Sequence, residues 1–123
     1  MTGSAEKLEV IRARTARVPF WGYLGAELLE VGDGYCRIGL PARRELGRRL
    51  GGFHGGALAA LVDLAVVVSH LSAHEVQDIE SGIGGSTVNL NITYVSPAVD
   101  DQVFAEGRVL RRGGTLTTVE VDI

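Results

Sequence analysis

Residues 53–71 read FHGGALAALVDLAVVVSHL, and from Ala57 to Leu71 almost every side chain is apolar all the way round a helical wheel. The three consecutive valines favour a strand, but the length of the apolar run and its alanines favour a helix. Such a helix needs cover on all sides. Its apolar core, interrupted by Asp63, is shorter than the ~20 residues of a bilayer-spanning helix. We therefore expect it to be buried in protein.

The segments before and after this helix carry weaker patterns. Residues 5–16 have the charged and apolar positions of a short amphipathic helix. Two strand-like runs lie between residues 24 and 42 around Gly32-Asp33-Gly34, a turn that favours a hairpin. The basic residues 43–52 are expected to form a surface loop, and residues 72–85 a polar, glycine-rich exit from the buried helix.

The remainder of the chain is predicted to be β. Residues 87–95 alternate apolar and polar side chains with period two, as in a strand with one buried face. Residues 102–110 and 116–123 are two further predicted strands around a glycine-containing connection. An antiparallel sheet that curls around the apolar helix accounts for these elements, because the sheet covers the helix. The predicted fold class is α+β.

Length and composition limit the domain count and the partners. With 123 residues, 46% of them hydrophobic, the chain suits a single domain over residues 1–123, in which residues 1–21 form an N-terminal helix and lead-in. The net charge of −3 creates no overall positive field for nucleic acid or an anionic membrane. Cys36 has no internal disulfide partner and is interpreted as a small apolar strand residue. With no signal-peptide pattern, we expect a cytoplasmic protein without nucleic-acid or membrane partners.

The motif Phe53-His54-Gly55-Gly56 stands immediately before the apolar helix. Glycines allow close backbone approach, and the first N–H groups of a helix have no intrahelical partner, so they can face a developing negative charge. A glycine pair also serves simply as a tight turn between loop and helix. The motif alone leaves an oxyanion hole and a structural turn both open.

Asp63 favours the chemical interpretation. A carboxylate is costly to bury on an apolar helix, and one that is kept there commonly acts as a general base or a nucleophile. The alternative is an ion pair or hydrogen bond that fixes the helix, with His70 as the candidate partner. Since the glycine-built helix start is only two turns away, we predict a catalytic role for Asp63.

Three further polar residues are weaker candidates. His54 could orient a carbonyl or a water molecule, and Thr87 could hold a water, although a loop histidine and a strand threonine commonly have structural roles alone. His70 and His74 have a spacing that suits a metal on a helix. No carboxylate or cysteine in a recognised pattern completes that site, so we expect no metal.

HGGALAALVD at residues 54–63 and TVNLNITYVSPA at residues 87–98 resemble the hot-dog acyl-CoA thioesterases of the phenylacetate-degradation group. The similarity runs from about Gly22 to the chain end. It implies the hot-dog fold, a curved antiparallel sheet wrapped around one long buried helix. It also implies hydrolysis of an acyl- or aryl-acyl-CoA thioester, with coenzyme A as part of the substrate and no cofactor.

The resemblance also implies roles for individual residues. Asp63 activates the hydrolytic water or attacks the thioester, and the Gly55 N–H polarises the carbonyl with support from His54. Thr87 stands where related enzymes carry a serine that positions water. The site lies between two subunits, with His54 and Gly55 of one facing Asp63 and Thr87 of the other. A homodimer is the minimum, and a homotetramer is expected.

Substrate binding is assigned to Gly56 and to basic surface residues that meet coenzyme A, whose other interpretation is solvated charge. The basic candidates are Arg48, Arg49, Arg111 and Arg112. Two departures from the family pattern stand out: Arg48 replaces an amide, and the family's final strand is expected to be absent from residues 1–123. A non-catalytic acyl-CoA binding protein and a hot-dog enoyl-CoA hydratase or dehydratase remain alternative hypotheses.

Overall fold

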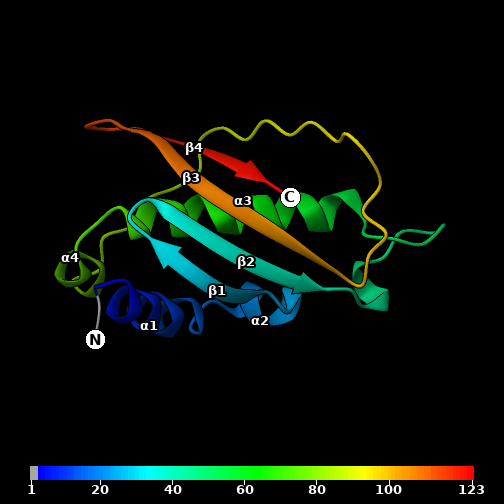
Figure 1. Cartoon of the computed structure of the whole chain (residues 1–123), viewed down its shortest axis with the longest axis horizontal. Helices are drawn as coiled ribbons and strands as arrows, with labels where there is room; N and C mark the ends of the chain where they lie inside the picture. The colour runs from blue at the N-terminus through cyan, green and yellow to red at the C-terminus, as the bar shows by residue number, and fades with distance from the viewer. Residues whose placement is uncertain (1–2) are drawn as a thin grey trace.

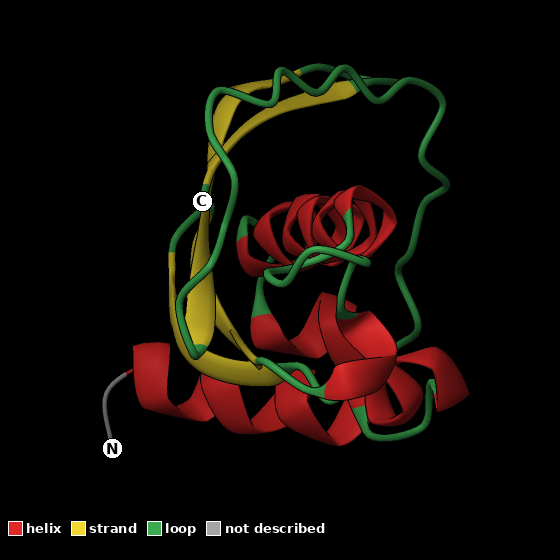
Figure 2. Cartoon of the chain, turned by 90° about the vertical axis from the view of Figure 1, so that its right-hand side faces the viewer, coloured by secondary structure: helices red, strands yellow, loops and turns green. Residues whose placement is uncertain are grey.

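A curved antiparallel sheet beside one long helix forms the centre of the computed structural model, which describes residues 3–123 (Figures 1 and 2). Residues 1 and 2 of the predicted lead-in lie outside the described residues. In chain order the elements are α1 (Gly3–Thr15), α2 (Pro19–Leu24), β1 (Glu27–Gly32), β2 (Tyr35–Pro41), the 3-10 helix η1 (Arg44–Leu46), α3 (Gly55–Ser72), α4 (Val76–Glu80), β3 (Gln102–Arg112) and β4 (Thr117–Asp122). The strand order is β1-β2-β3-β4, and α3 contacts all four strands.

The N-terminal half confirms the predicted helix and hairpin. α1 covers most of the predicted residues 5–16, and β1 pairs with β2 so that Gly32 lies opposite Tyr35. The turn between them ends on Gly34, whose φ of 68° is left-handed and therefore suits glycine. Cys36 lies on β2 with none of its surface exposed, as its interpretation as an apolar strand residue requires.

Two short helices, α2 and α4, lie in segments for which no helix was predicted. Pro19 is the first residue of α2, a position where its fixed φ and missing N–H cost nothing. α4 is only five residues long and follows Glu75 within the predicted polar exit. Helices this short carry too few apolar repeats to give a periodic pattern.

α3 lies close against the sheet at Gly107 of β3. A Cβ added to Gly107 would overlap Ser69 Oγ of α3 and would lie 3.2 Å from the Ala65 carbonyl oxygen, so only glycine leaves room for the helix. Ser69 Oγ is also 3.3 Å from Cys36 Sγ, and both side chains are fully buried. This contact sets how deeply α3 lies on the sheet.

The sheet covers one side of α3 and the other side is partly open, which corrects the expectation of a helix buried all round. Ten of its 18 residues are buried. The opposite face is partly open; it carries Ala59, Ala60, Asp63, Val66 and Val67, of which Val67 is 39% exposed. The physical reason is that one curved sheet covers one side of a cylinder. Although α3 is long and apolar enough to cross a membrane, core helices share that property.

Residues 87–95 do not form the predicted strand. Residues 83–100, here called the crossing loop, run from the end of α4 to the start of β3 without a strand partner among the described residues (Figure 1). The alternating apolar residues of 87–95 do not form one buried face, since Val88 is 77% exposed and Leu90 is 40% exposed. A strand needs a neighbouring backbone that takes its hydrogen bonds. β4, at the sheet edge, does not pair with this loop. The predicted strands at 102–110 and 116–123 are confirmed as β3 and β4.

Candidate functional site

The loop before α3 is held in place by backbone hydrogen bonds. Gly52 has a left-handed φ of 80°, and a Cβ there would lie 2.6 Å from the Ala98 carbonyl oxygen. The buried Phe53 donates its N–H to that same Ala98 oxygen at 2.8 Å, and His54 donates its N–H to the Leu46 oxygen at 2.7 Å. These contacts position the start of α3 between η1 and the crossing loop.

His54 is the N-cap of α3. Its Nδ1 accepts a hydrogen bond of 2.8 Å from the Gly56 N–H. In the neutral ring the proton must then be on Nε2, which leaves Nε2–H as a donor for a ligand. A Cβ on Gly56 would lie only 3.0 Å from Nδ1, so a larger residue would press on this cap. The Gly56 N–H is thereby used within the chain.

Gly55 supplies the free donor at the start of α3. Its N–H has no acceptor within residues 3–123. As the first helical residue it points this N–H out of the helix, at the positive end of the helix dipole. An N–H in this position can stabilise an oxyanion.

Asp63 lies half-buried on the open face of α3 and pairs with Thr87. The Thr87 hydroxyl donates a hydrogen bond of 2.6 Å to Asp63 Oδ1. No ion pair or hydrogen bond joins Asp63 to His70 in the described chain, so the sequence-based alternative of an Asp63–His70 contact is not observed. The carboxylate is therefore held from the crossing loop, with its second oxygen free of protein partners among residues 3–123.

His70 and His74 have partners of their own. His70 Nδ1 lies 3.2 Å from Thr117 Oγ1, and His74 Nδ1 lies 2.9 Å from the His70 carbonyl oxygen. The two rings meet edge to face, with centroids 4.8 Å apart. In the part of the chain that is described, no group of three His, Cys, Asp or Glu side chains is arranged to hold a metal ion.

One chain assembles two half-sites but does not join them. Gly55 and Asp63 are eight residues apart on the same helix, which is a rise of about 12 Å. A reacting carbon must lie about 3 Å from both the nucleophile and the oxyanion donors. His54 with Gly55 therefore forms one candidate half-site, and Asp63 with Thr87 forms the other.

The four arginine candidates are divided between the two ends of α3. Arg48 and Arg49 lie in the loop before the helix, and Arg48 Nε donates to a carbonyl of that loop at 2.8 Å. Arg111 and Arg112 lie at the end of β3, where Arg112 donates to the Ala73 oxygen at 2.7 Å, just after the helix. Within one chain they form no common basic surface.

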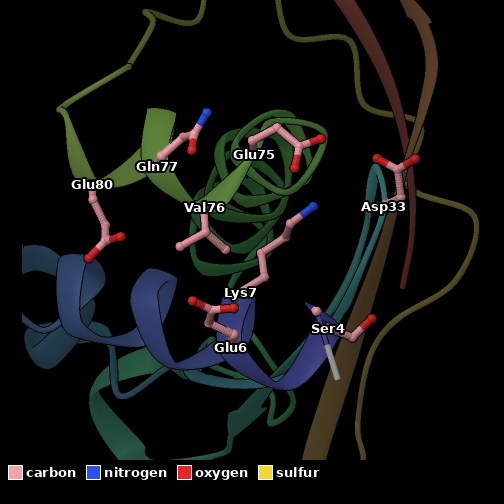
Figure 3. Close-up of a pocket in the computed structure, with 9 residues that line it drawn as sticks. Ser4, Glu6, Lys7, Asp33, Glu75, Val76, Gln77 and Glu80 are labelled. Atoms are coloured by element: carbon pink, nitrogen blue, oxygen red, sulfur yellow. The ribbon is translucent and has the colours of Figure 1, made fainter. Parts of the chain in front are cut away.

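Two surface hollows flank these elements. One, of about 550 Å³, lies beside the start of α3, and its lining includes Arg43, Arg44, Arg48 and Arg49 with Asp100 and Asp101. The other, of about 650 Å³, lies between α1 and α4, and its charged lining consists of Glu6, Lys7, Asp33, Glu75 and Glu80 (Figure 3). No predicted site residue lines the second hollow, and its negative charge does not suit the phosphates of coenzyme A.

Tyr94 is a residue of the site that the sequence analysis did not single out. Its hydroxyl donates a hydrogen bond of 2.8 Å to the Gly55 carbonyl oxygen. In the sequence it is one of the alternating apolar residues of 87–95, and nothing in that pattern indicates a contact 39 residues away.

The chain is similar in sequence and in fold to known proteins. The profile of the Thioesterase superfamily matches residues 50–123. Human acyl-coenzyme A thioesterase 13 is 32% identical over 126 residues, which cover 100% of this chain and 86% of the human protein. The E. coli PaaI protein from the phenylacetic acid degradation operon superposes with a TM-score of 0.82 at 16% identity, covering 98% of this chain and 82% of PaaI. Thioesterase superfamily member 2 of Mus musculus superposes with a TM-score of 0.77 at 23% identity, over 99% of this chain and 84% of the mouse chain.

Proposed function

Because the chain belongs to the thioesterase superfamily and has the hot-dog fold, we propose that it hydrolyses an acyl- or aryl-acyl-CoA thioester to a carboxylic acid and free coenzyme A. The observation that carries the proposal is the Asp63 carboxylate, held by Thr87 on the open face of the helix whose first residue, Gly55, has a free N–H. The identity to human acyl-coenzyme A thioesterase 13 along the whole chain supports the substrate class.

The proposed reaction uses each of these groups in turn. Asp63 takes a proton from water as a general base, or attacks the thioester carbon itself as a nucleophile. The carbonyl oxygen becomes negative and accepts hydrogen bonds from the Gly55 N–H and from His54 Nε2–H. Thr87 holds one carboxylate oxygen, so that the other faces the reacting atom. Collapse of the tetrahedral intermediate breaks the carbon–sulfur bond, and the thiolate leaves and takes up a proton. On the general-base route this step gives the carboxylic acid directly. On the nucleophilic route it leaves a mixed anhydride on Asp63, which water then hydrolyses to the acid and the free carboxylate.

Two copies of the chain are needed for a complete site in this proposal. The separation of about 12 Å between Gly55 and Asp63 prevents one chain from placing both at one carbonyl. The partly open face of α3 offers an apolar surface for a second copy. His54 and Gly55 of one copy would then face Asp63 and Thr87 of the other. The minimal assembly is a homodimer, and two such dimers would form the homotetramer expected from the resemblance.

Coenzyme A phosphates are assigned to the end of the site near the start of α3. Arg48 and Arg49 line the hollow there, and the arginines of its lining outnumber the two aspartates. Replacing both Arg48 and Arg49 by Gln is expected to raise KM for acyl-CoA more than it lowers kcat, since phosphate contacts are equal in ground and transition states.

Thiol release is the primary test of the function. Purified protein is assayed with aromatic, short-chain and long-chain acyl-CoAs, and Asp63→Asn is expected to remove most of the turnover. Asp78→Asn is the matched control, since Asp78 is an exposed acid on α4 away from the site. The assignment fails if Asp63→Asn hydrolyses the panel as fast as the parent. Loss of crotonyl-CoA absorbance without thiol release would identify a hydratase. Tight binding of a CoA thioether without any thiol release would identify a binding protein.

Mixing two inactive variants tests the shared site. His54→Asn removes the imidazole but keeps a good helix N-cap, and Asp63→Asn removes the carboxylate. If each site draws on both copies, a mixed dimer regains one intact site, and a random mixture recovers about a quarter of the parental activity. Recovery is absent if all four residues act within one chain.

A further inference from the structure

We propose that Tyr94 is a positioning residue of the thioesterase reaction, which holds Gly55 so that its N–H is aimed at the oxyanion. The inference rests on the proposed function. Tyr94 lies in the crossing loop, and its hydroxyl donates a hydrogen bond of 2.8 Å to the carbonyl oxygen of Gly55. It does not touch the reacting atoms and acts through Gly55.

The start of α3 needs such a restraint because it consists of two consecutive glycines. Glycine has the greatest backbone freedom of any residue, whereas an oxyanion donor must be oriented before the reaction begins. The His54 cap restrains the Gly56 N–H. The Tyr94 hydroxyl restrains the peptide group between Gly55 and Gly56 from the outside, in addition to the helical hydrogen bond of the Gly55 carbonyl.

The Tyr94 ring also lies against Gly55. A Cβ added to Gly55 would be 3.5 Å from Cε1 and 3.6 Å from Cζ of the ring, which is ordinary van der Waals contact. The ring thus occupies the space beside the Gly55 Cα. Tyr94 itself is 56% exposed, so the hydroxyl contact is not a by-product of burial in the core.

The crossing loop connects the two half-sites through its contacts. Thr87 binds Asp63, Tyr94 binds Gly55, and the Ala98 oxygen accepts a hydrogen bond from the loop before α3. The loop has no strand ladder within the described residues, so these contacts, together with that of Gly84 with His70, hold it against α3. Removal of the Tyr94 hydroxyl therefore loosens the loop at Gly55 and leaves its contact with Asp63 in place.

Kinetics of Tyr94→Phe test the proposal, because this change removes only the hydroxyl. We expect kcat for the preferred acyl-CoA to fall about tenfold while KM changes less than about twofold, since the oxyanion forms only during the reaction. Tyr23→Phe is the matched control: Tyr23 is 67% exposed on α2, and its hydroxyl has no partner in the described chain. It should match the parent. Equal kcat for Tyr94→Phe and the parent overturns the proposal.

Amide hydrogen exchange gives a measurement that does not need activity. In NMR spectra, the Gly56 amide, which is hydrogen-bonded to His54, is expected to exchange several-fold faster in Tyr94→Phe than in the parent or Tyr23→Phe, because the first turn frays. Unchanged exchange overturns the positioning role even if the parent proves inactive. A parent that releases no thiol while exchange still responds to Tyr94→Phe overturns the proposed function and leaves the hold on Gly55 supported.

Discussion

The Thr87 hydroxyl donates a 2.6 Å hydrogen bond to Asp63 Oδ1, joining the crossing loop to α3 across 24 residues of sequence. The bond lies on the side of α3 that the sheet does not cover. It orients one carboxylate oxygen and leaves the other without a protein partner among residues 3–123. In the proposed reaction, the Asp63 carboxylate and the position of the loop are therefore coupled through one hydroxyl.

Replacing Thr87 by Val should lower kcat about tenfold or more, because a hydrogen bond to a charged group contributes about 1.5–3 kcal/mol. Thr87→Ser should keep most of the activity. Thr93→Val in the same loop is the control, since Thr93 is exposed and its hydroxyl has no partner in the described residues. Initial rates of thiol release decide the outcome, and a Thr87→Val enzyme as fast as the parent would show that the bond has no catalytic role.

Gly107→Ala should destabilise the fold by about 1–3 kcal/mol, because the added methyl group overlaps Ser69 Oγ on α3 and the core must shift. Gly114→Ala, in the connection after β3, is the control, because a Cβ there meets nothing within 4 Å. Urea unfolding followed by circular dichroism gives both free energies. Equal effects of the two substitutions would mean that close packing at Gly107 does not limit stability.

Acidification should destabilise the protein through His70. Burial lowers the pKa of His70, and the nearby His74 and Arg112 lower this pKa further. A hydrogen bond with the Gly84 backbone raises the pKa and offsets part of the decrease. The unfolded chain, with a histidine pKa of about 6.5, therefore binds this proton at a higher pH than the folded chain. The free energy of unfolding therefore falls as the pH drops from about 6.5 toward the pKa of His70 in the folded protein. Above about pH 6.5 this contribution to stability is fully present.

The His70→Gln variant isolates that contribution. Its unfolding free energy, measured in urea at several pH values between about 7.5 and 5, should depend less on pH than that of the parent. If the two proteins show the same pH dependence, His70 is not responsible for the acid sensitivity.

Cys36 should be inert in the native protein. Burial raises the pKa of its thiol, and its Sγ lies 3.5 Å from the Ala65 carbonyl oxygen inside the core. The reactive species is the thiolate, so a disulfide reagent should modify the folded protein at least about a hundredfold more slowly than the unfolded protein. Rapid labelling of the folded protein would contradict the buried position.

Some elements could be predicted because their causes are local. The composition of residues 57–71 favours a core helix, and the Asp33-Gly34 turn favours a hairpin, whatever the rest of the chain does. The spacing of His54, Gly55 and Asp63 along one helix follows in the same way. The alternating pattern of residues 87–95 is local too. Strand formation is not local, because a strand needs hydrogen bonds with the backbone of another segment.

The central helix and the hairpin could be predicted because backbone preference and apolar periodicity act between neighbouring residues, and the same local pattern nominated Asp63 and Gly55 as the candidate acid and donor. The tertiary structure alone decided which face of α3 stays open, that residues 87–95 remain a loop, and that Thr87 and Tyr94 contact Asp63 and Gly55. These outcomes depend on contacts between segments 24 and 39 residues apart, which no local pattern contains.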